Sequence, residues 1–443
     1  MSLTPDDQSA LRRSLQVYRL AAPFVTALLA PGFLRRLLKR GGYKAHFGQR
    51  FGHFTPAERE RLRAHRWTWI RSISVGETLV AIKLAKALRA ENPTLQIAIS
   101  ITTSTGYEVA AKEANDWLFV FYNPVDTRSA VRRVLSLLRP TRLILIEGEI
   151  WPNLMSACLH DTIPVMLANA RLSPRSARRF SKFQRWTSPF FKLLQWVGIP
   201  DEEDRARWLS IGLPKEKIIL TGSIKFDHAG VEINRHTEFA SLLSQSGLHD
   251  DDPLLIAGST HDGEEEILAH CLLQWREKHP TLRLFVAPRH VERVPTLLKE
   301  LAKTRLKIVL RSALPSPSPW DVLLLDTTGE LRHWYSLATV AFIGKSLSAT
   351  GGQNPVEPAL AGKPVVFGPH MENFESIVNL LLEGNGARQA RSSEHLAELV
   401  DTLLSDATAR SQLGANAKAA LSRHQGSSKR TAQLVLKTAE NQR

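Results

Sequence analysis

Cysteine and long apolar runs are both scarce in this chain of 443 residues, and each shortage excludes a class of protein. The two cysteines, Cys158 and Cys271, lie inside apolar helical patterns, so a disulfide framework or a zinc site has no support and a reducing compartment is favoured. The longest apolar run, residues 20–34, is about fifteen residues long, short of the roughly twenty needed to cross a bilayer.

Acidic residues are also in deficit. The chain has 43 Asp and Glu against 58 Lys and Arg, which gives a formal net charge of +15. Such a balance favours acidic partners: nucleic acid, anionic lipid or phosphorylated substrates. With 43% hydrophobic and 23% charged residues the composition is otherwise that of a globular protein, and the length predicts two or three domains.

The first fifty residues combine the apolar run with a concentration of positive charge. Pro23, Pro31 and Gly32 weaken the run as a straight helix. Cations beside an apolar segment are retained on the cytoplasmic side and attracted to anionic lipid, so we expect an interfacial or shallow membrane anchor over residues 1–50. A signal peptide, a full span or an ordinary packed helix remain alternatives. The basic residues between positions 11 and 66 are Arg12, Arg13, Arg19, Arg35, Arg36, Lys39, Arg40, Lys44, Arg50, Arg59, Arg61, Arg63 and Arg66.

A second basic segment covers residues 171–196 and contains no acid. Aromatic residues are interleaved with its cations, and amphipathic rings are at home at lipid headgroups. We therefore expect a lipid-contacting surface here, although a solvated helix face is the simpler alternative. The cations are Arg171, Arg175, Arg178, Arg179, Lys182, Arg185 and Lys192, and the aromatics are Trp186, Phe190, Phe191 and Trp196.

From residue 67 onward, short apolar runs alternate with helical patterns, which predicts parallel sheets covered by helices on both faces. The rhythm breaks at residues 228–252, so we expect a linker near 228–250 between two Rossmann-like domains, 51–240 and 241–443, with the last helix possibly returning to the first domain. Ligands of such sheets bind at the carboxyl ends of the strands, here in a cleft between the domains. The strands are expected at 67–73, 96–102, 118–121, 143–146, 164–168, 217–220, 253–257, 282–287, 306–310, 322–325, 340–343 and 364–367.

Polar sequence follows three expected strands of the first domain. Residues 74–77 (SVGE) place Glu77 at a helix start, where a carboxylate can accept a proton from a hydroxyl group or can simply complement the helix dipole. Residues 147–153 (EGEIWPN) bring two more carboxylates, Glu147 and Glu149, with the same two interpretations. Asn169 and Arg171 follow the next strand.

The second domain has two small-residue loops between a strand and a helix. Residues 257–265 (AGSTHDGEE) and 351–358 (GGQNPVEP) can present backbone N–H groups to a phosphate, and Glu357 can bind ribose hydroxyls. Lys225, Arg289 and His290 each follow a strand and can pair with a phosphate or carboxylate. A structural Gly-Gly turn and surface ion pairs are the alternatives.

Seven segments in this order resemble the 3-deoxy-D-manno-octulosonic acid (Kdo) transferases of Gram-negative bacteria. They are SVGE, EGEIWPN, NARLS, GSIKFD, AGSTHDGEEE, APRH and GGQNPVEPALAGKPVVFGPHMENF. The resemblance implies an inverting, metal-independent GT-B glycosyltransferase without a cofactor, acting at the cytoplasmic face of the inner membrane. Its donor would be CMP-Kdo and its acceptor the lipid A precursor of lipopolysaccharide. The family usually has Thr at position 148 and His at position 353, where this chain has Gly148 and Gln353.

The resemblance also implies roles for individual residues. Glu77 is expected to be the general base on the acceptor hydroxyl. The acceptor-binding residues are expected to be Ser74, Gly76, Glu147, Glu149, Asn169 and Arg171. The donor-binding residues are expected to be Lys225, Ser259, Thr260, Pro288, Arg289, His290, Gly351, Gly352, Asn354 and Glu357.

Two other functions fit parts of the sequence. Another GT-B enzyme could use a UDP-sugar, either as a transferase or as an epimerase. A basic membrane- or nucleic-acid-binding protein would explain the charge alone, but no nucleic-acid module is recognisable in the sequence. We therefore expect no nucleic-acid partner.

Overall fold

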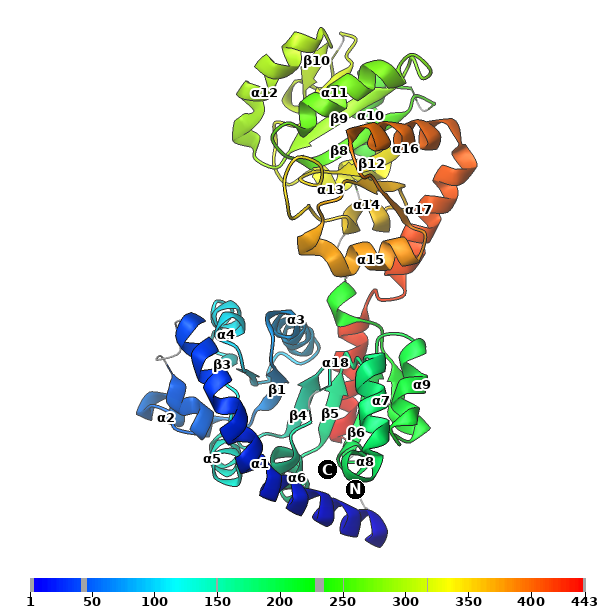
Figure 1. Ribbon diagram of the computed structural model, residues 1–443. Coiled ribbons are helices and arrows are strands. Elements are labelled where there is room, and N and C mark those ends of the chain that lie inside the picture. The colour runs from blue at the N-terminus through cyan, green and yellow to red at the C-terminus, as the bar shows by residue number, and fades with distance from the viewer. Residues whose placement is uncertain are drawn as a thin grey trace. The chain divides into compact units, whose positions relative to one another are not determined.

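The computed structural model (Figure 1) describes residues 4–40, 46–148, 150–227, 235–249, 251–316 and 318–440. The chain divides into two compact units, Met1–Asp227 with Gly426–Arg443 and His228–Gln425. We call them the first and the second unit. Each contains one seven-stranded sheet in which the neighbouring strands are parallel. The predicted fold class, two Rossmann-like α/β domains, is confirmed.

The sheet of the first unit has the strand order β3-β2-β1-β4-β5-β6-β7. Helices cover both of its faces, so all residues of β1 to β5 are buried and the strands are nearly continuous apolar runs. Successive residues still alternate: Trp69 packs in one hydrophobic core and Ile70 in another. The strands are β1 (Thr68–Ser72), β2 (Ile97–Ile101), β3 (Leu118–Tyr122), β4 (Arg142–Ile146), β5 (Val165–Ala168), β6 (Leu194–Ile199) and β7 (Ile218–Leu220).

Five of the described helices in the first unit begin next to a hydroxyl side chain that caps them. Thr55, Ser74, Thr103, Thr127 and Ser173 each accept a hydrogen bond from a backbone N–H of the first helical turn. These caps fix where the chain turns after a strand or loop. The helices are α1 (Pro5–Arg40), α2 (Pro56–Ala64), α3 (Val75–Glu91), α4 (Ser104–Ala111), α5 (Arg128–Leu138), α6 (Pro152–His160), α7 (Pro174–Lys182), α8 (Gln184–Phe191), α9 (Glu203–Ser210) and α18 (Ser427–Glu440).

Helix α1 contains the apolar run of the N-terminal segment. It continues through Pro23, Pro31 and Gly32, although we expected these residues to weaken it. Leu11 and Leu15 are buried in the core, where α1 packs against α6 and α8, whereas Leu20 and Phe24 are 73% and 78% exposed. Among the residues that the structure describes, no helix is both long and apolar enough to cross a membrane.

The second basic segment is only in part the surface that we expected. Trp186 is 40% exposed, but Phe190, Phe191 and Trp196 are buried. Trp196 is buried because residues 194–199 form a strand that we did not predict, β6, between β5 and β7. Phe190 and Phe191 belong to α8 and pack in the other hydrophobic core of the unit. The prediction of an exposed aromatic surface is therefore wrong for these three residues.

The sheet of the second unit has the order β10-β11-β9-β8-β12-β13-β14. Its strands are β8 (Leu254–Thr260), β9 (Arg283–Pro288), β10 (Ile308–Leu310), β11 (Val322–Leu324), β12 (Val340–Ile343), β13 (Val365–Phe367) and β14 (Ala387–Gln389), of which β14 was not expected. Its helices are α10 (His236–Gln245), α11 (Glu264–Trp275), α12 (Val294–Leu301), α13 (Leu331–Trp334), α14 (Val356–Leu360), α15 (Glu375–Glu383), α16 (Ser393–Ser405) and α17 (Ala407–Ser422).

The segment that we expected to be a linker contains helix α10. Phe239 and Leu243, four residues apart, lie on one buried face of this helix, and the Phe239 ring stacks on Trp334 with 4.2 Å between centroids. The helix therefore belongs to the second unit, and the expected boundary between residues 240 and 241 would cut through it. The division lies between Asp227 and His228 instead.

The C-terminal helix α18, red in Figure 1, lies among elements of the first unit and packs against α3. The buried Asp227 carboxylate holds its start: Oδ1 accepts the backbone N–H of Gly426 at 2.8 Å and Oδ2 that of Ser428 at 2.7 Å. Near the other end of α18, the Trp196 indole N–H donates to the Thr438 hydroxyl at 2.9 Å.

Asp227→Ala should loosen α18, because it leaves two backbone N–H groups without their acceptor. We expect the free energy of unfolding to fall by about 1–3 kcal/mol and the amides of α18 to exchange faster with deuterium. The control is Asp116→Ala, at an exposed turn of the same unit. Equal stability of both variants would contradict this role of Asp227.

Candidate active site

In each unit the strand order reverses beside the first strand. The chain leaves β1 toward β2 and β3 and returns on the other side at β4, and in the second unit it leaves β8 toward β9 and returns at β12. Loops that leave neighbouring strands in opposite directions open a crevice at the carboxyl ends of those strands, where ligands of such sheets bind. The segments SVGE and EGEIWPN follow β1 and β4, so two of the predicted motifs lie at this point of the first unit.

The SVGE segment forms the start of α3. Ser74 is the helix cap, the Glu77 Oε2 atom accepts the Ile73 N–H at 2.9 Å, and its Oε1 atom accepts the Ser74 hydroxyl at 3.1 Å. Glu77 is half-buried and Gly76 exposed. A Cβ added to Gly76 would meet only the Ser74 Oγ at 3.9 Å, so packing does not require glycine. Its missing side chain leaves the approach to the helix start open.

A cluster of charged side chains lies at the carboxyl ends of β4, β5 and β7. Glu147 follows β4 with a positive φ of 68°, and the Arg171 N–H donates to its carbonyl oxygen at 2.9 Å. Burial raises the pKa of Glu147, while the nearby cations Arg171 and Lys225 act in the opposite direction. The Phe226 ring lies 5.8 Å from the Arg171 guanidinium and 5.9 Å from the Lys225 Nζ. Lys225, predicted to bind the donor, thus belongs to the first unit together with two predicted acceptor residues.

Asn169 connects these strand ends. It is buried with a φ of 53°, and its Oδ1 accepts the Ile224 N–H at 3.0 Å and the Ser223 hydroxyl at 3.3 Å. These bonds hold the segment that carries Lys225 against the end of β5. The Asn169 Oδ1 atom thus positions the segment of Lys225, and the contact of Asn169 with the acceptor stays a prediction.

One buried group beside the EGEIWPN loop was not foreseen. Asp126 accepts the N–H groups of Asn153 and Leu154 at 2.9 Å each, at the start of α6, and accepts the Tyr18 hydroxyl from α1. Arg19 of α1 donates to the Asn153 Oδ1 at 2.8 Å. The N-terminal helix is thus bonded directly to the motif. No local pattern reveals this network, because its members come from distant parts of the sequence. Glu149 lies outside the described residues.

In the second unit, four predicted donor residues lie at or just beyond the carboxyl ends of β8 and β9. Ser259 has a positive φ of 56° at the end of β8, Pro288 is buried as the last residue of β9, and Arg289 and His290 are exposed just beyond it. Because β8 and β9 are neighbours, the structure brings Ser259 and Arg289 together at the carboxyl ends of these strands. Exposed cations there can neutralise an anionic ligand.

The loop after β8 serves mainly to hold the unit together. The Thr260 hydroxyl is buried and donates to Glu265 at 2.8 Å, which in turn pairs with Arg293 at 2.8 Å. The buried Glu264 accepts the N–H groups of Lys345, Ser346 and Leu347 at 2.7–2.9 Å, tying this loop to the one after β12. The Thr260 side chain therefore faces the interior of the unit, which does not fit the predicted contact of this side chain with the donor.

The GGQNP loop carries the remaining predicted donor-binding residues, Gly351, Gly352, Asn354 and Glu357. Gly351 and Gly352 have φ values of 108° and 66°, but their N–H groups already donate to the Glu372 carboxylate at 2.6 Å and the Lys345 carbonyl at 3.0 Å. These two amides are therefore bonded within the protein, and the contact of Gly351 and Gly352 with the donor stays a prediction. Asn354 is exposed. Glu357 is the second residue of the short helix α14, and burial raises its pKa.

Comparison with known proteins identifies the family. The family described as 3-deoxy-D-manno-octulosonic-acid transferase (kdotransferase) matches residues 45–228. The 3-deoxy-D-manno-octulosonic acid transferase of Haemophilus influenzae is 32% identical over 401 residues, 90% of this chain and 92% of that protein. The enzyme of the same name from Bordetella pertussis is 30% identical over 426 residues, 94% of this chain and 97% of that protein.

Among solved structures, the C-terminal CMP-Kdo binding domain of WaaA from Acinetobacter baumannii is 28% identical and covers 43% of this chain and 99% of its own, with a TM-score of 0.40. The two Rossmann-like domains and the curated relatives define a glycosyltransferase. The chain belongs to the 3-deoxy-D-manno-octulosonic acid transferase family.

Glu147→Gln should stabilise the protein at neutral pH. The raised pKa of Glu147 means that the folded state binds a proton more readily than the unfolded chain, whose ordinary pKa is 4.5. This contribution to stability is fully present below that pH and is lost as the pH rises through the raised pKa. Urea unfolding should therefore show a more stable variant at pH 7 and a shrinking difference toward pH 4.

The matched control is Glu203→Gln, which removes an exposed carboxylate from α9. A Glu147→Gln variant that is less stable than the wild type at pH 7 would show that the attraction to Arg171 and Lys225 outweighs the cost of burial.

Proposed function

We propose that this protein transfers Kdo from CMP-Kdo to a hydroxyl group of the lipid A precursor, with inversion at the anomeric carbon and without a metal ion. Membership of the family supports the transferred sugar. The observation that carries the mechanism is the Glu77 carboxylate, held by two hydrogen bonds at the open start of α3, where the strand order reverses.

Glu77 acts as the general base. The acceptor oxygen attacks the anomeric carbon of Kdo while the bond from that carbon to the phosphate oxygen breaks. The hydroxyl proton passes to the Glu77 carboxylate, and CMP leaves with the bonding electrons. A single displacement of this kind inverts the anomeric centre. A positioned base contributes typically 10²–10⁴-fold to such a step.

Cationic side chains bind the anionic groups of the donor and the acceptor. Arg289 and His290, exposed beside Ser259 in the second unit, bind the phosphate of CMP. Arg171 and Lys225, beside Glu147 in the first unit, bind the anionic groups of the acceptor or the Kdo carboxylate. Guanidinium and ammonium groups neutralise the departing phosphate, which is the task that a metal performs in other transferases.

The proposed acceptor is a membrane lipid, and the family resemblance implies the inner membrane. We therefore propose that the enzyme acts at the cytoplasmic face of this membrane. The exposed side chains of Phe24 and Trp186, and the exposed cations Arg12 and Arg13 of α1, support this location, because apolar side chains flanked by cations bind an anionic lipid surface.

Glu77→Gln should slow transfer strongly and leave the fold unchanged. Glutamine can still accept the Ile73 N–H, but it cannot take a proton from the acceptor. We expect kcat to fall by about 10²–10⁴-fold, while CMP affinity by calorimetry and the circular dichroism spectrum stay unchanged. Product mass after incubation with CMP-Kdo and lipid A precursor measures the transfer.

The control is Glu108→Gln, at an exposed position of α4. Near-normal transfer by Glu77→Gln would exclude Glu77 as the base. A UDP-sugar offered in place of CMP-Kdo should give no product, and glycosylation from UDP-N-acetylglucosamine would overturn the donor assignment.

A further inference from the structure

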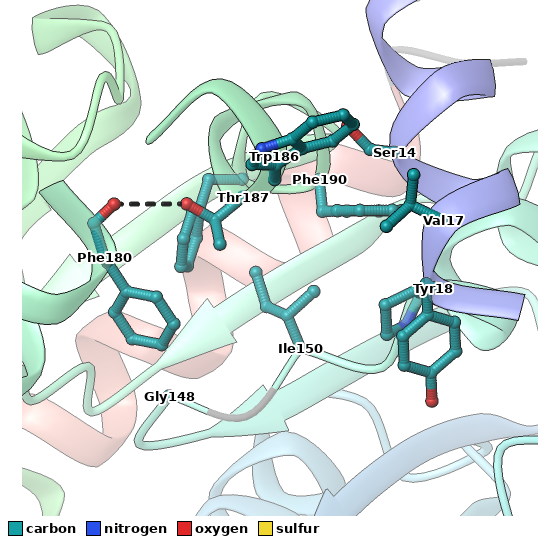
Figure 2. Close-up of a pocket in the computed structure, with 11 residues that line it drawn as sticks. Ser14, Val17, Tyr18, Gly148, Ile150, Phe180, Trp186, Thr187 and Phe190 are labelled. Carbon is teal, nitrogen blue, oxygen red and sulfur yellow. Dashed lines mark hydrogen bonds between the residues drawn. The ribbon is translucent and has the colours of Figure 1, made fainter. Parts of the chain in front are cut away.

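A pocket of about 270 Å³ lies in the first unit between α1, α7, α8 and the loop that carries the EGEIWPN motif (Figure 2). Val17 and Tyr18 of α1, Phe180 of α7 and Trp186 of α8 are among the residues that line it. Figure 2 shows the Ile150 side chain between Phe180 and Tyr18, and Gly148 and Pro152 of the same segment also line the pocket. Most of the lining is apolar, yet two of its side chains, Val17 and Trp186, are 48% and 40% exposed, so the pocket is open to solvent.

We propose that this pocket holds one acyl chain of the lipid acceptor, which orients the sugar hydroxyl relative to Glu77. The proposal rests on the function proposed above, because it takes the acceptor to be an acylated, phosphorylated saccharide. Three features of the pocket support this occupant: its volume, the positive charge around it and its connection to the EGEIWPN loop.

The size suits a hydrocarbon chain. An apolar cavity of roughly 150 Å³ binds benzene, a molecule of six carbon atoms. A pocket of about 270 Å³ therefore has room for most of one acyl chain of roughly ten to twelve carbons. Each buried methylene group contributes about 0.8 kcal/mol to binding, so even a partly inserted chain gains appreciable affinity.

The charge suits a phosphorylated amphiphile. Helices α7 and α8 carry five exposed cations and no acid. Within the described part of the chain, no carboxylate lies within ion-pair distance of Arg175, Arg178, Arg179 or Lys182. Arg185 lies over the Trp186 ring, 5.7 Å from its centroid. An apolar pocket beside uncompensated cations matches a hydrocarbon chain that ends in an anionic headgroup, whereas a neutral apolar metabolite would leave these charges unused.

The connection to the motif places the chain where the acceptor is needed. Gly148 and Ile150 come one and three residues after Glu147, so the wall of the pocket and the Glu147 carboxylate belong to one loop. The Tyr18 hydroxyl, on the α1 side of the pocket, donates to Asp126, which caps α6 at the other end of that loop. An acyl chain seated between α1 and α8 therefore lies against the loop that carries Glu147, and its headgroup meets the acceptor-binding residues.

The test compares acylated with deacylated acceptor. Val17→Trp fills the pocket from an exposed position of α1, so the fold should tolerate it. We expect the ratio of kcat/KM for lipid A precursor to kcat/KM for its deacylated, water-soluble form to fall at least tenfold, the loss expected from roughly two unburied methylene groups. Transfer to the deacylated acceptor should not change.

The matched control is Gln16→Trp, which adds the same bulk to the neighbouring exposed position outside the pocket lining. Its ratio should equal that of the wild type. An unchanged ratio in Val17→Trp would overturn the proposal, and so would an equal loss in both variants, because that result indicates general contact with the membrane surface.

A binding measurement separates this proposal from the proposed function. Calorimetry with dodecyl phosphate below its micelle concentration should show one site per chain in the wild type and in Gln16→Trp, weakened at least tenfold in Val17→Trp. If the wild type transfers Kdo to neither acceptor, the proposed function fails, and this titration still tests the pocket. Equal binding by Val17→Trp and the wild type would show that the pocket does not hold the chain.

Discussion

The site depends on a constraint of chain topology: in both sheets the strand order reverses beside the first strand. β1 with β4, and β8 with β12, send their loops in opposite directions. Everything reactive in this account follows one of the strands near these two points. Glycine residues, and positive φ values at Glu147, Asn169 and Ser259, turn the chain sharply as it leaves a strand, which supports the same geometry.

The parts of the fold that could be predicted from the sequence are those with strong local patterns. Buried parallel strands are uniform apolar runs, so twelve were located, most of them within two residues of their bounds. β6 was not predicted because its first residues belong to the basic segment 171–196, where the pattern of cations and aromatics indicated that Trp196 lies at the surface. β14 is three residues long and contains an arginine, and α10 lies in polar sequence where only Phe239 and Leu243 signal a buried face.

Candidate side chains were predictable, but their partners were not. The position of Glu77 at a helix start could be predicted, whereas the hydrogen bonds that hold its carboxylate needed coordinates. The acids after β8 looked like part of a ligand loop, yet Glu264 binds three backbone amides of a loop far along the chain. The contact of Tyr18 with Asp126 likewise joins the N-terminal helix to a motif that no spacing rule relates to it. Long-range pairing of this kind leaves no periodic signal in the sequence.

The central claim is that ligands bind at the carboxyl ends of the strands beside each reversal. Hydrogen–deuterium exchange of the wild-type protein with and without CMP tests it most directly in the second unit. The account predicts slower exchange in residues 257–263 and 288–293, after β8 and β9, with little change at the amino ends of the same strands. Protection confined to the amino ends of the strands, or found only in the first unit, would contradict it.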